Sequence, residues 1–434
     1  MEAGIKLEQS RLIPNSQFLI PLFAIAYFYT NLKSFMPRVL RIMNRLIVGG
    51  PILNALLLTK YMAPEFETMF VVGEKEDHEQ DAGFLLKDLD IKPVYIPEMG
   101  RSLHAGKDAR SYQKLKNIMR EFKPDIVHTH AAKPGALGRM AAKAMRVPVI
   151  VHTYHGHVFH SYFNKLKTQA FIQIERHLAR QSDGIIAISE QQKKELVEDF
   201  RIAPAHKFHL VPLGFNLDKF RVDQDAKRLS FRQEFQVADD EIAIGIIGRM
   251  VPVKNHTLFI EAIHYVLKHT NRKIKAFIIG DGDTRKPIEE MAAALGISFS
   301  IQDAAVHPHP LVFTSWRSDV DRIYAGLDIV ALTSFNEGTP VSLIEAQAAN
   351  KPIVSTRVGG IADIVVEGET ALLSGVEEHE LFCRNLLKLV EDDSARANMG
   401  QTGSALVMEK FSYKRLVKDM ATVYYHLLDK KSRQ

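Results

Sequence analysis

The chain has 434 residues, of which 46% are hydrophobic and 25% charged, and these fractions are typical of a folded protein rather than a disordered one. Its 56 basic and 51 acidic side chains give a formal net charge of +5, which allows phosphate-bearing ligands or an anionic membrane surface but does not demand nucleic acid. The single cysteine, Cys383, excludes an internal disulfide and a cysteine-cluster metal site, and we expect it to be a small buried residue in a reducing cytoplasm. The length exceeds one ordinary core and predicts two or three domains.

Residues 1–35 are predicted to lie outside the fold. The apolar stretch "FLIPLFAIAYFY" is shorter than the ~20 residues that a membrane-spanning helix needs, and it contains Pro21. Met36 begins "MPRVLRIMNRLIVGG", a basic lead into a first strand. Two explanations stay open: the native chain begins at Met36, or the extension is a membrane-surface anchor.

From Val39 onward, short apolar runs alternate with helix-like segments. The predicted strands of this half lie in "VLRIMNRLIV", "ETMFVVG", "DIVHTH", "PVIVHTYHG", "DGIIAIS" and "KFHLVPLGF". Strands that alternate with helices form parallel sheets of the doubly wound type. Ligands bind such sheets beyond the carboxyl ends of the strands, where the loops between these segments lie.

The same pattern restarts after a charged segment, residues 216–241, which is predicted to be a linker and a surface helix. The second set of strands lies in "IAIGIIGRM", "IKAFIIGDGD", "PLVFTSW", "DIVALTS" and "KPIVST". The predicted fold class is therefore α/β, with two doubly wound parallel-sheet (Rossmann-like) domains that face each other across a cleft. The predicted boundaries are 36–213, 214–410 and a final helix, 411–434, and the cleft is the expected ligand site.

Two glycine-containing turns could approach phosphate groups. In "IIGRMVPVKN", Gly248 ends a strand, Arg249 follows at once, and Lys254 comes just before a new helix. Two cations and the helix amides at such a turn would form a diphosphate cradle, whereas the alternative is two solvated charges. The corresponding turn of the first half contains Gly49 and Gly50, but matches neither a Walker loop nor a dinucleotide fingerprint.

Two glutamates lie eight positions apart in "SFNEGTPVSLIEAQAANKPIVST". Glu337 lies in a predicted loop beside Gly338 and Pro340, and Glu345 lies in the helix that follows. Because two helical turns take about 7 residues, the two carboxylates could lie along one line and contact one ligand.

Histidines gather after one predicted strand of the first half. No His-Glu-x-x-His pattern is present, so a zinc site is the minor interpretation. Two other interpretations stay open. The histidines are polar loop residues with hydrogen-bond partners, or at least one of them contacts a substrate. The histidines concerned are His152, His155, His157 and His160, and "HTH" at 128–130 ends the preceding strand.

Three further motifs have a structural interpretation that we prefer. Asp281 and Asp283 resemble a metal-holding aspartate pair, but "DGD" also satisfies a turn. Ser189 is predicted to be a helix N-cap, with Gln192 completing a capping box. Trp316, next to Arg317, could flank a nucleobase, but a packed tryptophan is more common.

Together these motifs resemble glycosyltransferase family 4 (glycosyl transferases group 1), retaining enzymes of the two-domain GT-B architecture. The resemblance runs from Val39 to about Leu428. Its motifs are the two glycines of the first loop, "FKPDIVHTH", "HTYHG", "IIAISE", "VPLGFNLDKF", "GRMVPVK", the glutamate doublet and "VGGIADIVVEGETALL".

The resemblance implies a role for each matching residue. Residues 36–213 would take the acceptor, residues 214–410 would bind a nucleotide sugar, and the last helix would cross back to the first domain. Glu337 would contact donor-sugar hydroxyls and Glu345 the ribose, while Arg249 and Lys254 would neutralise the leaving diphosphate. The implied catalytic residues are His155 (or, two positions on, His157), Glu337, Arg249 and Lys254; the implied donor-binding residues are Gly49, Gly50, Gly248, Arg249, Lys254, Glu337, Gly338, Thr339, Pro340, Val341, Ser342 and Glu345.

The function implied is a retaining hexosyltransferase that needs no metal and no cofactor. A UDP-sugar is the expected donor, and a glycan or lipid-linked molecule in capsule, exopolysaccharide or lipopolysaccharide assembly is the expected acceptor. We expect the protein in the cytoplasm, with peripheral contact at the inner face of the cytoplasmic membrane, and no nucleic-acid partner. The alternatives are a nucleotide-sugar epimerase on the same scaffold and, in a different class, a basic nucleic-acid-binding or regulatory protein.

Overall fold

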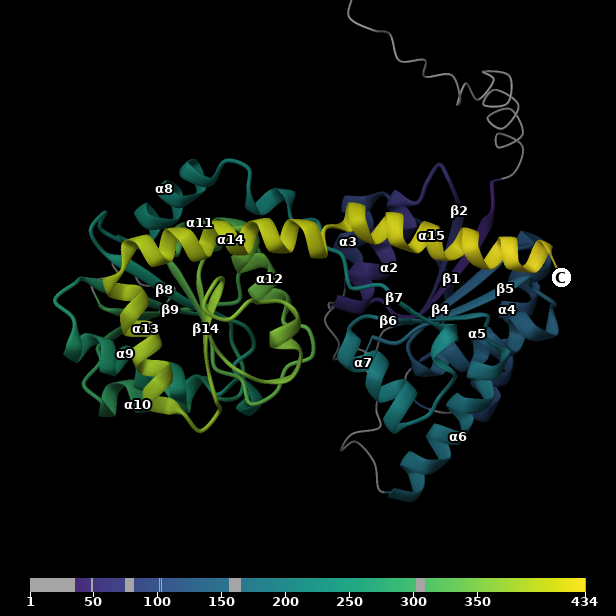
Figure 1. Cartoon of the computed structure of the whole chain (residues 1–434), viewed down its shortest axis with the longest axis horizontal. Helices are drawn as coiled ribbons and strands as arrows, with labels where there is room; N and C mark the ends of the chain where they lie inside the picture. Colours follow the sequence, from purple (N-terminus) through teal and green to yellow (C-terminus); the bar gives the residue numbers. More distant parts are fainter. Residues whose placement is uncertain are drawn as a thin grey trace, which may run out of the picture.

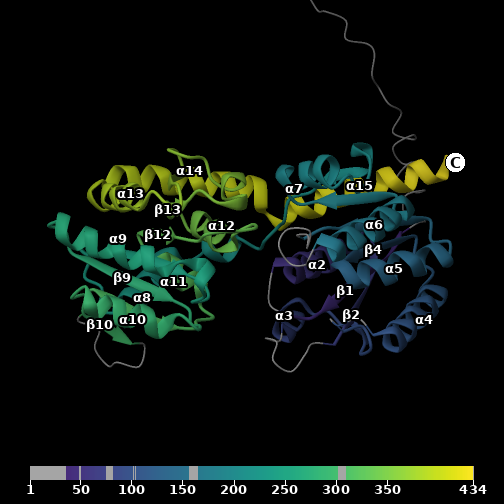
Figure 2. The same ribbon diagram turned by 90° about the horizontal axis from the view of Figure 1, so that it is seen from below.

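The computed structural model describes residues 36–47, 50–74, 82–100, 102, 104–155, 165–301 and 309–433, and the side chains of 165–167 are left out of the description. Residues 1–35, Gly49, His157 and His160 lie outside this range, so the predictions made for them stay predictions. Figures 1 and 2 show two α/β lobes along the long axis of the molecule, with the last two helices, α14 (Asp393–Phe411) and α15 (Tyr413–Ser432), running over both.

The first lobe is built on a seven-stranded sheet with the order β3-β2-β1-β4-β5-β6-β7, in which neighbouring strands pair in parallel. Its strands are β1 (Arg38–Arg45), β2 (Glu67–Gly73), β3 (Val94–Ile96), β4 (Ile126–His130), β5 (Val149–Thr153), β6 (Gly184–Ala187) and β7 (Phe208–Leu210). Its helices are α2 (Gly50–Tyr61), α3 (Gly83–Leu89), α4 (Ala105–Phe122), α5 (Ala132–Ala144), α6 (Lys165–Gln181), α7 (Glu190–Lys194), the π-helical turn η1 (Glu195–Asp199) and the 3₁₀ turn η2 (Ala205–Lys207).

The second lobe repeats the arrangement with a parallel seven-stranded sheet of order β10-β11-β9-β8-β12-β13-β14. Its strands are β8 (Ile242–Ile247), β9 (Ile274–Ile279), β10 (Phe299–Ile301), β11 (Leu311–Ser315), β12 (Ile329–Leu332), β13 (Ile353–Thr356) and β14 (Ala371–Ser374). Its helices are α8 (Gln224–Glu234), α9 (His256–His269), α10 (Arg285–Ala294), α11 (Val320–Gly326), α12 (Val341–Ala348) and α13 (His379–Glu391), with 3₁₀ turns η3 (Asp218–Phe220), η4 (Pro252–Lys254) and η5 (Gly359–Asp363).

These two sheets confirm the predicted fold class. Because helices join most consecutive strands and the strands pair in parallel, the central strands of each sheet are buried apolar runs, whereas the edge strands β3 and β10 are partly exposed. The strand order reverses between β1 and β4 in the first sheet and between β8 and β12 in the second. Crevices for ligands form at such switch points, outside the carboxyl ends of the strands.

The register of β1 and β4 places polar residues on one face of the first sheet. Arg41 pairs with His128, and Ile42 pairs with Thr129. Since successive side chains alternate between faces, Arg41 and His128 point to the same side. That side is covered by α15, whose buried residues, among them Tyr424, belong to the same core as Val39 and Ile126. The other face packs against α4 and α5.

The charged segment 216–241 forms the predicted helix, α8, but it is not a simple surface element. Phe220, Phe231 and Phe235 are at most 1% exposed and belong to the core of the second lobe. The prediction underestimated the segment because its apolar residues are few and widely spaced among charged ones, although each is large.

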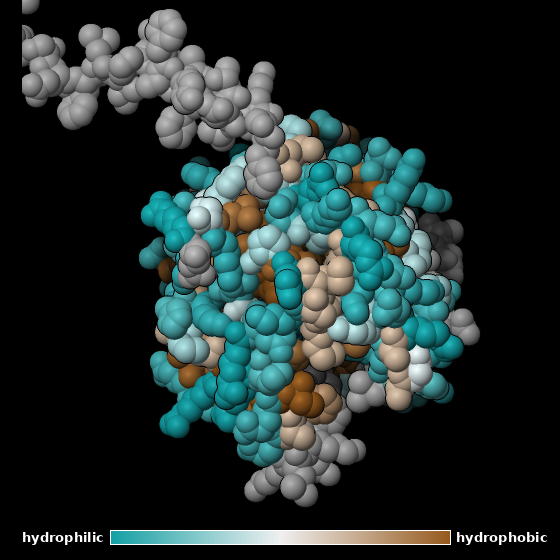
Figure 3. All heavy atoms as spheres, turned by 90° about the vertical axis from the view of Figure 1, so that its right-hand side faces the viewer, coloured by the Kyte–Doolittle hydropathy of each residue, from teal (hydrophilic) through white to brown (hydrophobic). Residues whose placement is uncertain are grey.

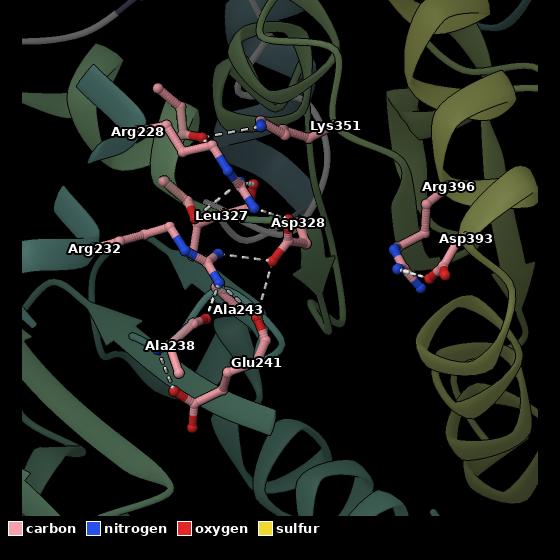
Figure 4. A network of polar contacts seen from close by, with 12 residues as sticks. Arg228, Arg232, Ala238, Glu241, Ala243, Leu327, Asp328, Lys351, Asp393 and Arg396 are labelled. Atoms are coloured by element: carbon pink, nitrogen blue, oxygen red, sulfur yellow. Dashed lines mark hydrogen bonds and ion pairs between the residues drawn. The ribbon is translucent and has the colours of Figure 1, made fainter. Parts of the chain in front are cut away.

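A polar network fastens α8 to the start of β12 (Figure 4). Arg228 Nη2 donates to Asp328 Oδ1 at 2.8 Å, and Arg232 Nη1 donates to Asp328 Oδ2 at 3.2 Å. The backbone amide of Ala243, in β8, donates to the same Oδ2 at 2.8 Å. One carboxylate thus connects a helix with the two strands at the switch point of the second sheet.

Two smaller predictions are confirmed. Cys383 is 6% exposed in α13, and burial raises its pKa to about 11, as befits a core residue. Ser189 caps α7, because its side chain accepts from the amide of Gln192 at 3.1 Å. The predicted capping box is wrong, because the Gln192 side chain accepts from the amide of Ile188 at 3.0 Å rather than from that of Ser189. No helix among the described residues is long and apolar enough to span a membrane.

Candidate functional site

An ion pair lies at the switch point of the second sheet. Lys254 Nζ is 2.5 Å from Glu337 Oε1, and Ser334 Oγ donates to the same oxygen at 2.6 Å. The side chains of Lys254 and Glu337 are 22% and 10% exposed. Glu337 Oε2 has no hydrogen-bond partner among the described residues, so this oxygen remains available to a ligand.

The two loops that carry this pair are tied together through their backbones. The loop after β8 ends at Lys254, and its carbonyl accepts from Thr333 Oγ1 at 2.8 Å. The amide of Phe335, in the loop after β12, donates to the carbonyl of Val253 at 2.8 Å. Lys254 and Glu337 therefore have fixed relative positions before any ligand arrives.

A glycine pair allows a third loop to press against Glu337. A Cβ atom on Gly359 would lie 1.8 Å from the Glu337 carbonyl oxygen, and one on Gly360 would lie 2.0 Å from that of Gly338. The amide of Gly360 donates to the Glu337 carbonyl at 3.2 Å. Gly359 also has φ of +49°, a conformation that favours glycine. The loop after β13 thus supports the backbone of the predicted sugar-contacting residue.

Arg249, predicted to share the diphosphate with Lys254, has different surroundings. Its side chain is exposed and forms no ion pair with the residues that the structure describes. Gly248, just before it, has φ of +156° at the end of β8. The site therefore holds one cation that is neutralised by Glu337 and one that is not.

Glu345 lies one helical turn into α12, beside Tyr324 of α11. Burial raises its pKa to about 7, while Lys219 and a hydrogen bond with Tyr324 act in the opposite direction. Tyr324 Oη itself donates to the Ser342 carbonyl at 2.9 Å. Glu337 precedes α12, which begins at Val341, so the idea that both carboxylates lie along one helical line is wrong. They lie in separate surroundings, one with Lys254 and one with Tyr324.

The start of α12 lies between the two carboxylates. Gly338 is exposed, Pro340 is the buried N-cap, and Thr339, Val341 and Ser342 are partly exposed. The first amides of a helix have no partner within the helix, so they are free to bind an anion or a hydroxyl.

The first lobe approaches this helix through its own switch point. A Cβ atom on Gly50, the first residue of α2, would lie 4.0 Å from Val341 Cγ2 and 3.8 Å from Leu213 Cδ1. Gly50 lies in the first lobe, and α12 lies in the second. The predicted first-loop residue therefore faces the predicted donor-binding helix.

His155 follows β5 in the first lobe. Its Nε2 lies 2.8 Å from His130 Nδ1, and its buried Nδ1 has no hydrogen-bond partner among the residues that the structure describes. Burial lowers its pKa to about 4, so it is neutral at physiological pH. His152 has a structural role, because its Nδ1 lies 2.8 Å from Thr129 Oγ1 inside the core.

The "DGD" segment forms the predicted turn. Asp281 accepts from the amide of Gly282 at 2.8 Å, from Ser315 Oγ at 2.5 Å and from Arg285 Nη1 at 3.0 Å. The hydrogen bond from Ser315 is the main reason that its pKa is lowered. Within the described ranges, no group of three potential ligands is arranged to hold a metal ion.

The preferred interpretation of Trp316 is wrong, because this side chain is 56% exposed. It follows β11, and no core position faces it. Arg317 is held by Glu234 and Asp319, at 2.7 Å from each.

Several residues beside the site were given no site role in the sequence analysis: Arg41, Ser334, Tyr324, Gly359 and Tyr424. Arg41 had a usable signal, since it is a charged residue in the middle of a strand whose neighbours are apolar. The others depend on contacts between distant segments and left no local pattern.

Comparison with known proteins identifies the family. The family model described as Glycosyltransferase Family 4 matches residues 55–219, and that described as Glycosyl transferases group 1 matches residues 227–405. A UDP-Gal:alpha-D-GlcNAc-diphosphoundecaprenol alpha-1,3-galactosyltransferase of Escherichia coli is 26% identical over 321 residues, 72% of this chain and 79% of the relative. The capsular polysaccharide biosynthesis glycosyltransferase CapM of Staphylococcus aureus is 25% identical over 343 residues, 78% of this chain and 86% of the relative.

Solved structures share the fold. Anabaena Alr3699/HepE in complex with UDP superimposes with a TM-score of 0.72 at 19% identity, covering 90% of this chain and all of that one. A glycosyltransferase from Rickettsia africae gives a TM-score of 0.74 at 18% identity, covering 91% and 99%. The two family models together match most of the chain on both sheets. The chain therefore belongs to the family 4 glycosyltransferases (glycosyl transferases group 1), and it is a hexosyltransferase-type enzyme with the GT-B fold.

Proposed function

We propose that the protein is a retaining transferase that moves a hexose from a UDP-sugar to a glycan or lipid-linked acceptor in the assembly of a cell-surface polysaccharide. The observation that carries this proposal is the arrangement at the second switch point. Lys254 pairs with Glu337 in the loop before α12, Glu345 lies within α12, and Arg249, which forms no ion pair in the described part of the chain, lies in the same loop after β8 as Lys254. The donor and acceptor classes are supported by the names of the E. coli and S. aureus relatives and by the UDP complex of the Anabaena protein.

Each end of the donor has a matching group in this arrangement. Glu345 accepts from the ribose hydroxyls, and Glu337 Oε2 accepts from a hydroxyl of the sugar. The diphosphate would lie between Arg249 and Lys254. Their positive charges stabilise the anion that forms when the diphosphate leaves the sugar. Because Lys254 already contacts Glu337, the sugar-binding and phosphate-binding groups act as one unit.

In the transfer, the acceptor oxygen bonds to the anomeric carbon as the bond from that carbon to the diphosphate breaks. The acceptor proton passes to an oxygen of the leaving phosphate, so no protein nucleophile is required. Attack occurs on the face that the diphosphate leaves, which retains the anomeric configuration. The approach of Gly50 to Val341 brings the lobes together around this step and limits the access of water.

The first experiment measures thermal stabilisation by nucleotides and nucleotide sugars without added metal. A ligand that binds the folded state raises its melting temperature. We expect one UDP-sugar to stabilise the wild type more than its analogues do, and Glu345→Ala to lose the effect. Failure of every nucleotide to stabilise the wild type would contradict the proposal.

Transfer is then measured with the selected donor, a panel of lipid-diphosphate-linked and free glycans, and a chelator. We expect a product with the donor's anomeric configuration and an unchanged rate in the chelator. A sugar nucleotide altered in the absence of acceptor would instead indicate an epimerase. Nucleic-acid binding that weakens steeply with salt, without nucleotide-sugar affinity, would indicate the third class.

We also propose cytoplasmic localisation with electrostatic contact to an anionic membrane surface. A cavity of about 560 Å³ between α6 and residues 197–207 of the first lobe is lined by five basic side chains and, among the described residues, by no carboxylate. The surface at the outer end of the same lobe is mainly hydrophilic, with apolar residues in small groups, so deep insertion from that end is not favoured (Figure 3). The basic lining residues are Arg176, Arg180, Arg201, His206 and Lys207.

Vesicle co-sedimentation tests this contact. We expect binding to phosphatidylglycerol vesicles that decreases with salt, and weak binding to phosphatidylcholine. The variant Arg180→Ala/Arg201→Ala removes two exposed charges of the cavity and is expected to reduce binding. Equal binding of the variant would exclude this surface.

A further inference from the structure

Three stacked imidazoles lead from the core of the first lobe to His155, the residue that the sequence predicts to contact the donor sugar. The ring centroids of His128 and His130 are 4.3 Å apart, and those of His130 and His155 are 5.1 Å apart, with interplanar angles of 27° and 22°. We call these three residues the imidazole column. Its inner end contacts Arg41 of β1 and Tyr424 of α15.

Arg41 is a buried cation without an acidic partner. It is 0% exposed, and no carboxylate in the described part of the chain lies within ion-pair distance. Its Nη1 lies 3.1 Å from His128 Nδ1 and 3.5 Å from His130 Nε2, its Nη2 lies 3.7 Å from Met62 Sδ, and its Nε is buried without a partner. Burying an unpaired charge disfavours folding, so a requirement of the fold alone does not account for it.

Because the guanidinium of Arg41 can only donate hydrogen bonds, it determines which ring nitrogens of the column are protonated. Arginine only donates, so His128 Nδ1 and His130 Nε2 accept, and both rings are neutral. His128 Nε2 then donates to Thr153 Oγ1 at 2.7 Å, and His130 Nδ1 donates to His155 Nε2 at 2.8 Å. An imidazole that accepts at Nε2 and is neutral carries its proton on Nδ1. In His155 this is the buried atom that has no partner in the described structure.

We propose that Arg41 is a positioning residue that, through the imidazole column, holds His155 in the neutral tautomer that presents Nδ1–H to a hydroxyl of the donor sugar. This inference rests on the proposed function, because it assigns the sugar as the partner of Nδ1–H. Arg41 touches no reacting atom and acts only through the column.

The column is also kept neutral by its surroundings. Burial is the largest cause that lowers the pKa of each ring, and the charge of Arg41 lowers the pKa of His128 and His130 further. The other titratable groups at the column are Tyr424 from α15, whose Oη lies 2.6 Å from His128 Nδ1, and His152 from β5, whose charge lowers the pKa of His130. Loss of Arg41 is therefore expected to raise the pKa values of His128 and His130 and to move the acid limb of the activity profile to higher pH.

A double-mutant cycle tests whether Arg41 acts through His155. The loss of one hydrogen bond to a sugar hydroxyl corresponds to roughly a 3- to 10-fold decrease in kcat/KM. We expect this decrease for Arg41→Met and for His155→Ala, and no further decrease when the two are combined. Losses that multiply would show that Arg41 acts independently of His155 and would overturn the proposal.

Arg139→Met is the matched control, because Arg139 is equally buried in the same lobe but pairs with Glu175 at 2.8 Å. This control should lower the melting temperature and combine multiplicatively with His155→Ala. Arg41→Met should leave the melting temperature unchanged or raise it, since it removes an unpaired charge. Arg41→Leu, which likewise removes every donor at this position, replaces the methionine variant if that variant does not fold.

Nitrogen-15 NMR of labelled histidines tests the inference without activity. In the wild type, His155 should be protonated at Nδ1 and His128 at Nε2, and Arg41→Met should give mixed tautomers. Unchanged tautomers in the variant would overturn the proposal even in an active enzyme. If the wild type neither binds a nucleotide sugar nor transfers a hexose, the proposed function fails, while the tautomer result still decides the role of Arg41.

Discussion

Arg249 and Lys254 lie five residues apart, but different partners hold them. Lys254 is engaged by Glu337 before any ligand binds, and Arg249 is exposed without an ion pair in the described structure. A diphosphate that enters the site therefore gains a free cation from Arg249, whereas it must share Lys254 with a carboxylate. The two residues should respond differently to substitution.

Arg249→Ala is expected to weaken UDP binding by about 1–2 kcal/mol, roughly 5- to 30-fold, because a charge-assisted hydrogen bond to phosphate is lost. Uridine binding and the melting temperature should not change. Titration calorimetry with both ligands measures the difference, and Arg146→Ala, an exposed arginine just before β5, is the control. Equal losses for uridine and UDP would show that Arg249 does not contact the phosphates.

Glu345 connects stability with pH. Its folded-state pKa of about 7 lies above the ordinary value of 4.5 that applies to the unfolded chain. Between pH 4.5 and 7 the unfolded state has released this proton and the folded state has kept it. Raising the pH across this window therefore lowers the free energy of unfolding, by an amount on the order of 3 kcal/mol, and has no further effect above it.

The melting temperature from pH 4.5 to 8 checks this prediction when the wild type is compared with Glu345→Gln. The difference in melting temperature between the wild type and Glu345→Gln should change up to about pH 7 and then become constant, because glutamine does not titrate. UDP affinity should rise more steeply through the same window in the wild type than in Glu345→Gln, because the ionised carboxylate accepts from ribose more strongly, whereas the titration of the UDP phosphate is common to both. A constant difference across the range would contradict the assigned pKa.

At the scale of elements, the loop after β13 supports the loop that carries Glu337. Gly359→Ala would place a methyl group 1.8 Å from the Glu337 carbonyl oxygen and force alanine into a positive φ. We expect a loss of stability of at least ~2 kcal/mol and weaker binding of the UDP-sugar.

Gly368→Ala is the matched control for this change. Gly368 also has a positive φ, +79°, but nothing lies within 4 Å of the position that its Cβ would take. It should cost about 1 kcal/mol from backbone conformation alone and leave ligand binding intact. If both variants bind the UDP-sugar like the wild type, the support given by Gly359 is unnecessary for the site.

The strands and their alternation with helices could be predicted because buried parallel strands are continuous apolar runs, which are visible locally. The burial of α8 was not predicted, because its large apolar residues do not form a continuous apolar run. Its buried residues Phe231 and Phe235 are scattered among charges, and the buried Arg232 has partners that include Asp328, 96 positions away, as well as the nearby carbonyls of Ala238 and Glu241.

The predicted site residues could be selected from motifs, but their relationships could not. The sequence separates Lys254 from Glu337 by 83 positions, and only the adjacent ends of β8 and β12 bring them together. The imidazole column and its contacts Arg41 and Tyr424 come from β1, β4, the segment after β5, and α15. Tyr424 is 296 positions from His128, which it contacts. Such networks depend on strand order and register, which local patterns do not specify.

At the scale of the whole molecule, two chain segments that lie side by side connect the two lobes. Phe215, in the connection from the first lobe, pairs with the Phe411–Tyr413 segment between α14 and α15 through backbone bonds of 2.8 and 3.0 Å. Arg415 Nη2 donates to the carbonyls of Pro212 and Leu213 at 2.8 and 2.6 Å. Beyond this junction, α15 completes the core of the first lobe (Figures 1 and 2).

A chain that ends after Phe411 should therefore lose the fold of its first lobe while the second lobe stays folded. The deletion exposes the apolar residues on the face of the first sheet and removes the partner of His128, but none of Arg249, Lys254, Glu337 and Glu345 lies in the deleted part. Limited proteolysis should yield a resistant fragment that begins near Phe215, and calorimetry should show that it still binds UDP without catalysing transfer. A chain that ends after Leu428 keeps the buried residues of α15 and should resist proteolysis in both lobes. If the shorter chain also resists proteolysis in both lobes, α15 is not required for the fold of the first lobe.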